Sequence, residues 1–395
     1  MPVFFIMSRF HSYLSSAVLI VQSYDGAGPF VHYIKKHFAA NKKFGSRDRK
    51  VVTALCYCYF RTAHVLKAES VARKIIKSLF LCETNSHPLL LELDPELDEK
   101  TSWPLAQKFH FLELDPMAVF PFGAELGESI EPSLFASSFL RQPLLYMRLR
   151  PGRNKAVFEK LNKAALAYDL LKEDCVVLQN ATSLEKVLRL NKEAVVQDYN
   201  SQRVFDFPEN ISSLSSKEKK LTVWDCCAAS GGKSILMYDR MQENIQLTVS
   251  DIRKNILFNL QQRLQEAMVP VYKTFAADLL QGIPADSEEN FDIIICDVPC
   301  TGSGTWSRTP EQLAFFKLSS IDDYALRQQV IAGNAISLLK KGGLFFYITC
   351  SVFKKENEAN VAFLQKKYGV ELLQQQYLKG YEMQADTLYV AVLKK

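Results

Sequence analysis

Short apolar runs alternate with amphipathic stretches along the second half of the chain. The apolar runs predict buried strands at 221–226, 246–250, 271–275, 291–297 and 343–349, with a last strand at 388–392. Between them, apolar residues recur at three- and four-residue steps, which predicts helices at 232–242, 255–266, 322–339 and 356–367. Gly342 and Gly343 are expected to end the third of these helices. The alternation predicts an α/β domain, Rossmann-like and doubly wound around a parallel sheet, over residues 218–395.

Two other patterns precede this domain. Helical spacing of apolar residues predicts a mainly helical N-terminal domain over 1–135, in which frequent prolines and acids break 83–135 into loops and short helices. A small α+β module is then expected over 140–217. It is predicted to contain strands at 144–149 and 175–178, a helix at 155–171, and a serine- and lysine-rich linker at 212–220.

The composition is that of a globular protein, with 48% hydrophobic and 23% charged residues in a chain of 395. The nine cysteines follow no paired spacing, so we expect no disulfide framework and no metal site, and a reducing, cytoplasmic setting. The apolar segment at 1–21 is interrupted by Arg9 and His11 and lacks a small-residue cleavage site, which favours a buried first helix over an export signal. No apolar run reaches membrane-spanning length.

Charge is segregated along the first part of the chain, although the net charge is only +5. Between 31 and 80, only Asp48 and Glu69 oppose a long series of basic residues, whereas acids dominate from 81 to 135. The basic residues are Lys35, Lys36, Lys42, Lys43, Arg47, Arg49, Lys50, Arg61, Lys67, Arg73, Lys74 and Lys77. Solvated helix faces and a phosphate-binding surface both explain this pattern.

A glycine turn follows the first strand of the predicted sheet. It consists of Cys227, Ala228, Ala229, Ser230, Gly231, Gly232 and Lys233. A glycine pair at the start of a helix lets the backbone approach a ligand, and Asp251, at the end of the next strand, is placed to bind two ribose hydroxyls. Asp278 follows the third strand, where it is placed for an adenine amino group. This series predicts a site for an adenosine-bearing cofactor.

The end of the turn, Gly232-Lys233-Ser234, also matches the end of a P-loop, which would indicate a nucleotide hydrolase. A P-loop needs glycine at position 227, where this chain has cysteine, and the turn is too short to wrap a triphosphate. The P-loop interpretation is therefore disfavoured.

Two cysteines, Cys300 and Cys350, come at the ends of two apolar strands. A cysteine on such a strand is more often a small buried hydrophobe, which is the interpretation of Cys296, but the polar neighbours of the other two favour reactive thiols. A thiolate beside an adenosyl cofactor indicates methyl transfer to carbon 5 of cytosine. The thiolate adds at carbon 6, Asp297 contacts nitrogen 3, and a second group completes the reaction. Spacing alone does not assign the two cysteines to these steps.

At these positions the chain resembles the RsmB/Nop/Sun family of RNA cytosine-5 methyltransferases. The turn resembles the family's CAAPGGK, 297–300 its Asp-x-Pro-Cys, 349–351 its Thr-Cys-Ser and 356–358 its Glu-Asn-Glu. The resemblance implies S-adenosyl-L-methionine as cofactor, bound by the turn with Asp251, Asp278 and Asp297. It implies that Cys350 is the covalent nucleophile and Cys300 assists product release, with Asp297 and Lys233 also catalytic.

The resemblance extends upstream. Arg148 and Asn154 resemble the family's Arg-x-Asn entry segment, and 195–202 resembles its Val-Gln-Asp-x-x-Ser-Gln strand, so the module is expected to recognise RNA. The segment from Arg47 to Arg61 is similar to the helical, NusB-like domain of family members that modify rRNA. In the turn, Ser230 replaces the family's proline, which predicts weaker preorganisation of the turn but not a loss of binding.

These features predict methylation of carbon 5 of cytosine in RNA, with rRNA favoured as the partner, no membrane partner, and a cytoplasmic location. DNA is disfavoured because the residues around Pro299 and Cys300 differ from those of DNA cytosine methyltransferases. The alternative is a non-catalytic RNA-binding or ribosome-assembly protein with a vestigial cofactor pocket. That protein would be expected to lack Cys350, Asp297 or the glycine pair, and all are present.

Overall fold

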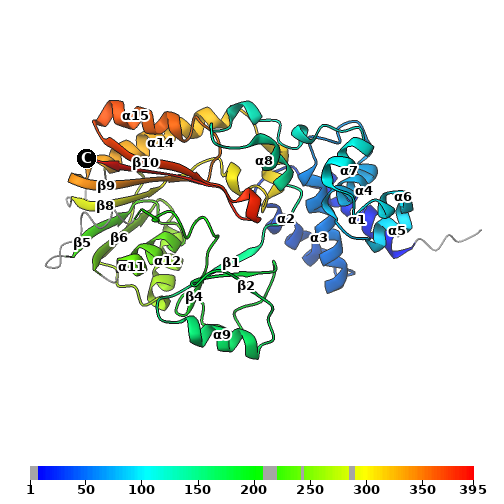
Figure 1. The fold of residues 1–395 in the computed structure, drawn as a ribbon, viewed down its shortest axis with the longest axis horizontal. Coiled ribbons are helices and arrows are strands. Elements are labelled where there is room, and N and C mark those ends of the chain that lie inside the picture. The colour runs from blue at the N-terminus through cyan, green and yellow to red at the C-terminus, as the bar shows by residue number, and fades with distance from the viewer. Residues whose placement is uncertain (1–7, 208–219, 242–243, 284–289) are drawn as a thin grey trace, which may run out of the picture. The chain divides into compact units, whose positions relative to one another are not determined.

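The computed structural model describes residues 8–207, 220–241, 244–283 and 290–395 (Figure 1). Its contacts divide the chain into two compact units, the first with residues up to 124, 131–142 and 306–318, and the second with 125–130, 143–305 and 319–395. Apart from Lys220, the predicted linker at 212–220 lies outside the described residues. The division into three domains at 1–135, 140–217 and 218–395 stays a prediction.

A seven-stranded sheet in the order β10-β11-β9-β8-β5-β6-β7 forms the centre of the second unit. Its strands are β5 (Leu221–Asp225), β6 (Ile245–Asp251), β7 (Lys273–Ala276), β8 (Phe291–Asp297), β9 (Leu339–Thr349), β10 (Glu371–Leu378) and β11 (Leu388–Lys394). The strands from β9 to β7 pair in parallel, and β11 and β10 add to the β9 edge in antiparallel register.

Helices cover both faces of this sheet. They are α11 (Gly232–Arg240), α12 (Lys254–Glu266), α14 (Ser320–Ser337) and α15 (Glu358–Tyr368). In Figure 1, α11 and α12 lie on one face and α14 and α15 on the other. Strands such as β8 are buried on both faces, which explains their continuous apolar sequence. The predicted α/β, Rossmann-like fold is confirmed.

Two features of the sheet differ from the predictions. The helix expected to end at Gly342 and Gly343 ends at Ser337, because the chain enters β9 before the glycines. Leu339 pairs with Phe291 and the next pair is Leu344 with Ile293, so 340–343 form a bulge in which Gly342 has φ +79°. Strand β10 was not predicted, because much of it is exposed at the sheet edge and its sequence is rich in glutamine.

Among the described residues, the small α+β module consists of a four-stranded sheet in the order β2-β3-β1-β4 and helix α9. Its elements are β1 (Leu145–Leu149), α9 (Asn154–Lys163), β2 (Asp169–Lys172), β3 (Cys175–Leu178) and β4 (Ala194–Val196). The helix predicted over 155–171 is wrong beyond Lys163. Ala165 takes a left-handed φ of +51°, and the Leu166 N–H donates to the Leu161 carbonyl at 3.1 Å, which ends the helix and leads into edge strand β2.

The first unit is helical, as predicted. Its long helices are α1 (Arg9–Ser23), α2 (Phe30–Ala40), α3 (Ser46–Arg61) and α4 (Val71–Cys82). Residues 83–138 form short helices, several of which begin at a proline, namely α5 (Pro88–Leu93), α6 (Pro95–Glu99), α7 (Leu105–Phe111), η1 (Pro116–Val119), η2 (Gly123–Glu125) and α8 (Pro132–Ser138). No helix among the described residues is long and apolar enough to cross a membrane.

A segment from the second half of the sequence completes the first unit. Helix α13 (Pro310–Phe315) packs on α3, and the Phe30 N–H donates to the buried Glu311 carboxylate at 3.2 Å. Two short turns, η3 (Ser303–Thr305) and η4 (Tyr381–Met383), belong to the second unit.

Candidate active site

The glycine turn connects β5 to α11 at the carboxyl edge of the sheet. Gly231 caps the helix with φ +80°, and a Cβ atom at this position would lie 2.4 Å from Leu260 Cδ1. Only glycine avoids both the backbone strain and this clash. The Ala229 N–H donates to Asp251 Oδ2 at 3.0 Å, which connects the turn to the end of β6.

A cavity of about 600 Å³ opens beside the turn. Several of the predicted cofactor and catalytic residues line it, namely Cys227, Ala229, Asp251, Asp278, Asp297, Cys300 and Cys350. Its volume and its carboxylates at successive strand ends fit an adenosine-bearing cofactor.

A second cavity of about 280 Å³ also borders this turn. Predicted residues that line it but not the first cavity are Ala228, Ser230, Gly232 and Lys233. Gly231 lines neither cavity and acts through its backbone conformation. Cys350 and Asp297 line both cavities, so the predicted nucleophile lies where the two meet.

The two predicted reactive thiols are in contact with each other in the first cavity. Cys300 Sγ lies 3.3 Å from Cys350 Sγ, and both side chains are partly buried. The contact with Cys350, together with burial, raises the pKa of the Cys300 thiol. Cys300 therefore holds its proton, and a hydrogen bond can join the pair.

Lys233 and Asp297 form an ion pair beside the thiols, with Lys233 Nζ 2.6 Å from Asp297 Oδ2. Burial lowers the pKa of Lys233, but the Asp297 carboxylate and the nearby Cys350 outweigh it, so the pKa is raised. The ammonium group of Lys233 therefore stays charged beside Cys350.

Residues 211–392 match the family described as 16S rRNA methyltransferase RsmB/F. These residues belong to the RsmB/Nop/Sun family. The RsmB/Nop/Sun relative in Xanthomonas campestris, ribosomal RNA small subunit methyltransferase B, is 28% identical over 248 residues, which cover 60% of this chain and 52% of the relative. Mouse tRNA (cytosine(72)-C(5))-methyltransferase NSUN6 is 30% identical over 165 residues, 39% of this chain and 34% of the relative. The chain spans about half the length, or less, of these curated relatives.

Solved structures share the fold. The crystal structure of PH0851 matches with a TM-score of 0.68 at 16% identity, over 97% of this chain and 98% of that chain. NSun6 from Pyrococcus horikoshii, solved with SFG, matches with a TM-score of 0.57 at 16% identity, over 67% of this chain and 95% of that chain.

Glu356, the first residue of the RsmB/Nop/Sun Glu-Asn-Glu ending, connects the two cysteine loops. Its buried carboxylate accepts hydrogen bonds from the Thr301 N–H at 2.9 Å and from Ser351 Oγ at 2.5 Å, while Gln328 Nε2 donates at 2.8 Å. Thr301 follows Cys300 and Ser351 follows Cys350, so one carboxylate fixes both loops. The sequence analysis gave Glu356 no such role, because only the family motif marked it.

Arg253 forms an ion pair with Asp251, whose carboxylate is predicted to bind the ribose. Its Nε donates to Asp251 Oδ1 at 2.9 Å and its Nη2 to Asp251 Oδ2 at 3.0 Å. Burial raises the pKa of Asp251, but the hydrogen bonds from Arg253 more than offset it, so the pKa is lowered. The Arg253 side chain is largely exposed, which leaves it room to turn away.

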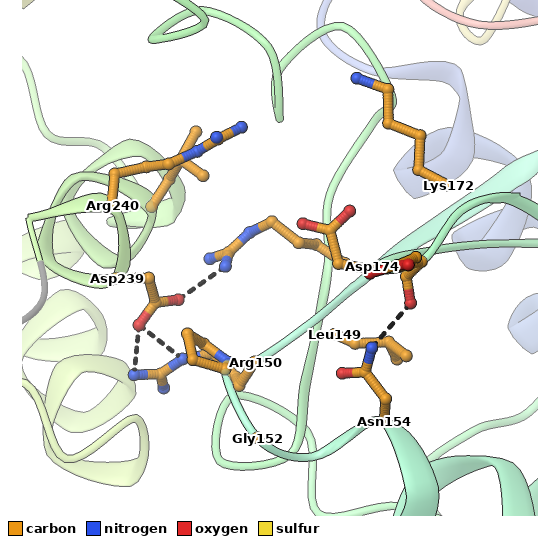
Figure 2. A pocket seen from close by; sticks show the side chains of 12 residues that line it. Leu149, Arg150, Gly152, Asn154, Lys172, Asp174, Asp239 and Arg240 are labelled. Carbon is orange, nitrogen blue, oxygen red and sulfur yellow. Dashed lines mark hydrogen bonds and ion pairs between the residues drawn. The ribbon is translucent and has the colours of Figure 1, made fainter. Parts of the chain in front are cut away.

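The upstream motif residues Arg148 and Asn154 lie outside both cavities. Arg148 and Asn154 line a third cavity of about 520 Å³, shown in Figure 2, where Asn154 Nδ2 donates to the Glu173 carbonyl at 2.8 Å. Gln197, from the segment at 195–202, does line the second cavity. The motif at 195–202 therefore contributes to the candidate site directly.

Proposed function

We propose that this protein methylates carbon 5 of cytosine in RNA, with S-adenosyl-L-methionine as the methyl donor, in the cytoplasm. The observation that carries this proposal is the position of Cys350. Its thiol lines both the cavity that fits the cofactor and the cavity that contains the Lys233–Asp297 pair, and it lies 3.3 Å from Cys300.

The larger cavity is assigned to the cofactor. Asp251 would accept hydrogen bonds from the ribose hydroxyls once Arg253 has turned away, and Asp278 would contact the adenine. When bound there, S-adenosyl-L-methionine supplies an electrophilic methyl group. The walls of this cavity reach the thiols, which keeps the donor close to the attacking base.

The smaller cavity is assigned to the target cytosine, which must leave its stack to enter. The Cys350 thiolate forms a bond with carbon 6, and carbon 5 then becomes nucleophilic. Asp297 is oriented by Lys233 and contacts nitrogen 3, which stabilises the adduct.

Product release requires two bonds to break. After carbon 5 has gained the methyl group, its proton passes to solvent and the electron pair of that bond restores the double bond between carbons 5 and 6. At the same time the bond between Sγ and carbon 6 breaks, and Cys350 leaves as a thiolate. Cys300 is assigned to the release of Sγ, because its protonated thiol lies 3.3 Å from Cys350 Sγ and can donate a hydrogen bond to the leaving thiolate. Removal of Cys300 should therefore leave the enzyme attached to its RNA.

The substrate is assigned as rRNA. The matched family and most of the similar curated relatives are named for methylation of small-subunit ribosomal RNA, whereas NSUN6 is named for tRNA. Assays with both RNA classes distinguish the two.

The test is incubation of the protein with tritiated S-adenosyl-L-methionine and either rRNA or tRNA. We expect label in RNA with the wild type, none with Cys350→Ala, and a trapped protein–RNA adduct with Cys300→Ala. Cys82→Ala removes a partly buried thiol outside both cavities and should behave as wild type. An adduct with Cys350→Ala but not with Cys300→Ala would reverse the two roles. Absence of label with either RNA would favour the assembly-protein alternative.

A further inference from the structure

An arginine on α12 that lines the second cavity, Arg263, holds the cofactor turn. Arg263 Nη1 donates to Ser230 Oγ at 2.8 Å and to the Ser230 carbonyl at 3.1 Å. Its Nε donates to Asn191 Oδ1 at 2.8 Å. Asn191 precedes β4 and has φ +67°. A single guanidinium group therefore connects the turn to a loop of the small α+β module.

The Asn191 loop is itself fixed. Asn191 Nδ2 donates to Glu266 Oε2 at 2.8 Å, and Arg150 Nη1 donates to the Asn191 carbonyl at the same distance. Glu266 and Arg263 both belong to α12, so the amide of Asn191 contacts two side chains of one helix. The hydrogen bonds of Asn191 therefore fix the position from which Arg263 contacts Ser230.

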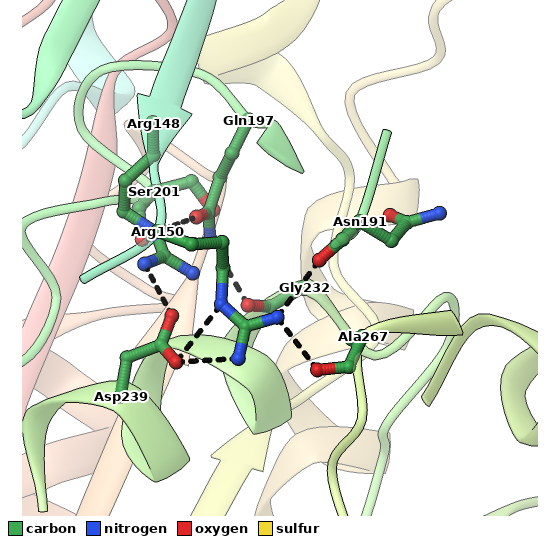
Figure 3. Close-up of polar contacts among 8 residues, drawn as sticks. All are labelled: Arg148, Arg150, Asn191, Gln197, Ser201, Gly232, Asp239 and Ala267. Atoms are coloured by element: carbon green, nitrogen blue, oxygen red, sulfur yellow. Dashed lines mark hydrogen bonds and ion pairs between the residues drawn. The ribbon is translucent and has the colours of Figure 1, made fainter. Parts of the chain in front are cut away.

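A second contact reaches the next part of the turn. Gln197 Nε2 donates to the Gly232 carbonyl at 3.3 Å, and Gln197 Oε1 accepts from Arg148 Nε at 3.1 Å (Figure 3). Arg148 also pairs with Asp239 at 2.6 Å, and Arg150 pairs with the other oxygen of the same carboxylate at 2.8 Å. The module therefore contacts α11 at both of its ends.

The ion pairs at the far end of α11 are well shielded from water. The side chains of Arg148 and Asp239 are only 4% and 6% exposed. Buried pairs of this kind keep their geometry, and breaking one leaves an uncompensated charge. The first turn of α11, which carries the predicted cofactor contacts, is thereby fixed relative to the module.

We propose that Arg263 and Gln197 are positioning residues for the cofactor turn, and that Arg263 supplies the constraint that proline supplies in the family's CAAPGGK turn. The inference rests on the proposed function, because the ligand is the cofactor assigned there. Proline fixes φ of the turn covalently. Here Ser230 accepts two hydrogen bonds from Arg263, which hold the same segment without a ring. The module thus belongs to the cofactor site, in addition to the RNA recognition predicted for it from the sequence.

The proposal is tested by calorimetric titration of the full chain with S-adenosylhomocysteine. We expect Arg263→Ala to weaken binding about tenfold, because hydrogen bonds from a charged donor are lost. The affinity of Arg263→Lys should lie between those of the wild type and Arg263→Ala, because one ammonium group cannot reproduce the two-pronged hydrogen bonding of the guanidinium group. Gln197→Ala should weaken binding by a smaller factor, because its contacts are longer. Gln262→Ala, an exposed neighbour on α12, is the matched control.

Proline at position 230 separates positioning from general stability. In the Arg263→Ala background, Ser230→Pro should recover most of the lost affinity, whereas in the wild type it should keep or slightly tighten binding. A merely structural role for Arg263 would lower the melting temperature and would not be rescued by proline. With RNA as the second substrate, the KM for the methyl donor should rise more than kcat falls.

Wild-type affinity in Arg263→Ala, or a failure of proline to rescue it, would overturn the proposal. If Arg263→Ala does not fold, the same comparison uses Arg263→Lys with and without Ser230→Pro. Lack of S-adenosylhomocysteine binding by the wild type would instead count against the cofactor assignment itself, so the two failures are distinguishable.

Discussion

At the scale of single residues, the reactive groups of the candidate site are already paired with one another. The thiols of Cys300 and Cys350 are in contact. Lys233 forms an ion pair with Asp297, and Arg253 forms one with Asp251. Such pairing fixes each side chain before a ligand arrives, and some pairs must open when it binds. Arg253 is the clearest case, because its carboxylate partner is the predicted ribose ligand.

Arg253→Ala should therefore tighten cofactor binding. The ion pair between the exposed Arg253 side chain and the buried Asp251 carboxylate competes with the ribose hydroxyls. Because the guanidinium group stays largely hydrated, the pair is expected to contribute about 1 kcal/mol, which corresponds to a gain of about fivefold in affinity. Titration with S-adenosylhomocysteine measures the change, with Lys254→Ala as the control for lost positive charge. Weaker binding in Arg253→Ala would mean that the arginine itself contacts the cofactor.

Asp225, buried at the end of β5, should make stability depend on pH. Burial raises its pKa to about 7, above the value of about 4 in an unfolded chain. The folded state therefore binds a proton that the unfolded state releases, and this contribution is present at low pH and lost as pH rises from about 4 to about 7. Its size is on the order of 4 kcal/mol at most.

Asp225→Asn should flatten this dependence, because asparagine keeps an acceptor for the hydrogen bond that Ser234 Oγ donates at 2.6 Å but cannot ionise. Denaturant unfolding between pH 5 and pH 8 measures it, with the exposed Asp323→Asn as control. If the wild type and Asp225→Asn lose stability in parallel, the assignment of this titration to Asp225 is wrong.

Residue types at strand ends predicted which residues lie together at the candidate site, for a physical reason. Asp251, Cys300 and Cys350 follow parallel strands, whose carboxyl ends meet at one edge of a sheet, so their proximity could be expected. Their division between two cavities could not, since it depends on how the turn folds. The roles of Gln197 and Arg263 were equally hidden, because each acts through contacts with residues distant in sequence.

At the scale of elements, the loops after β8 and β9 depend on a shared carboxylate. Glu356→Gln places an amide donor where the carboxylate accepts from Thr301, Ser351 and Gln328. At least one donor would lose its acceptor, at a cost of about 1–3 kcal/mol, and the cysteine loops would separate. Thermal unfolding should show a lowered melting temperature, and methylation should fall with it. Glu371→Gln, exposed on β10, is the control; an unchanged melting temperature in Glu356→Gln would refute this role.

Element types were predictable where apolar periodicity was long, and boundaries failed where backbone conformation decided them. Helix α9 ends at a left-handed alanine, Ala165, rather than at a glycine, so no turn residue marked the stop. Gly342 and Gly343, which were expected to end a helix, lie instead in the bulge at 340–343 within β9. Strand β10 forms because β11 offers it an edge, and that partner is not visible in the sequence of β10 itself.

At the scale of the whole molecule, the two units are not continuous in sequence. Residues 306–318 follow the Cys300 loop, yet they pack within the first unit, where Leu313 is fully buried and its carbonyl lies 2.9 Å from His64 Nε2. Deletion of the N-terminal helices would therefore remove the packing partners of a segment that directly follows the Cys300 loop in sequence. Tests of RNA binding by the first unit consequently require point variants of the full chain.

The basic residues of α2 and of the segment that follows it allow such a test. Lys35 and Lys36 are exposed on α2, and Lys42 and Lys43 are exposed just beyond it. If this surface binds phosphates, reversing two of these charges should weaken RNA binding and reduce the slope of log affinity against log salt by about two units.

We expect Lys35→Glu combined with Lys36→Glu to show this effect in filter binding at several salt concentrations, while calorimetric binding of S-adenosylhomocysteine stays at the wild-type value. The matched control reverses Lys366 and Lys367, an equally exposed lysine pair on α15, and alters net charge by the same amount. Equal losses in the two double variants would show that only overall charge matters. A selective loss in the α2 variant would assign phosphate binding to the first unit, because the two proteins differ only in where the charge was reversed.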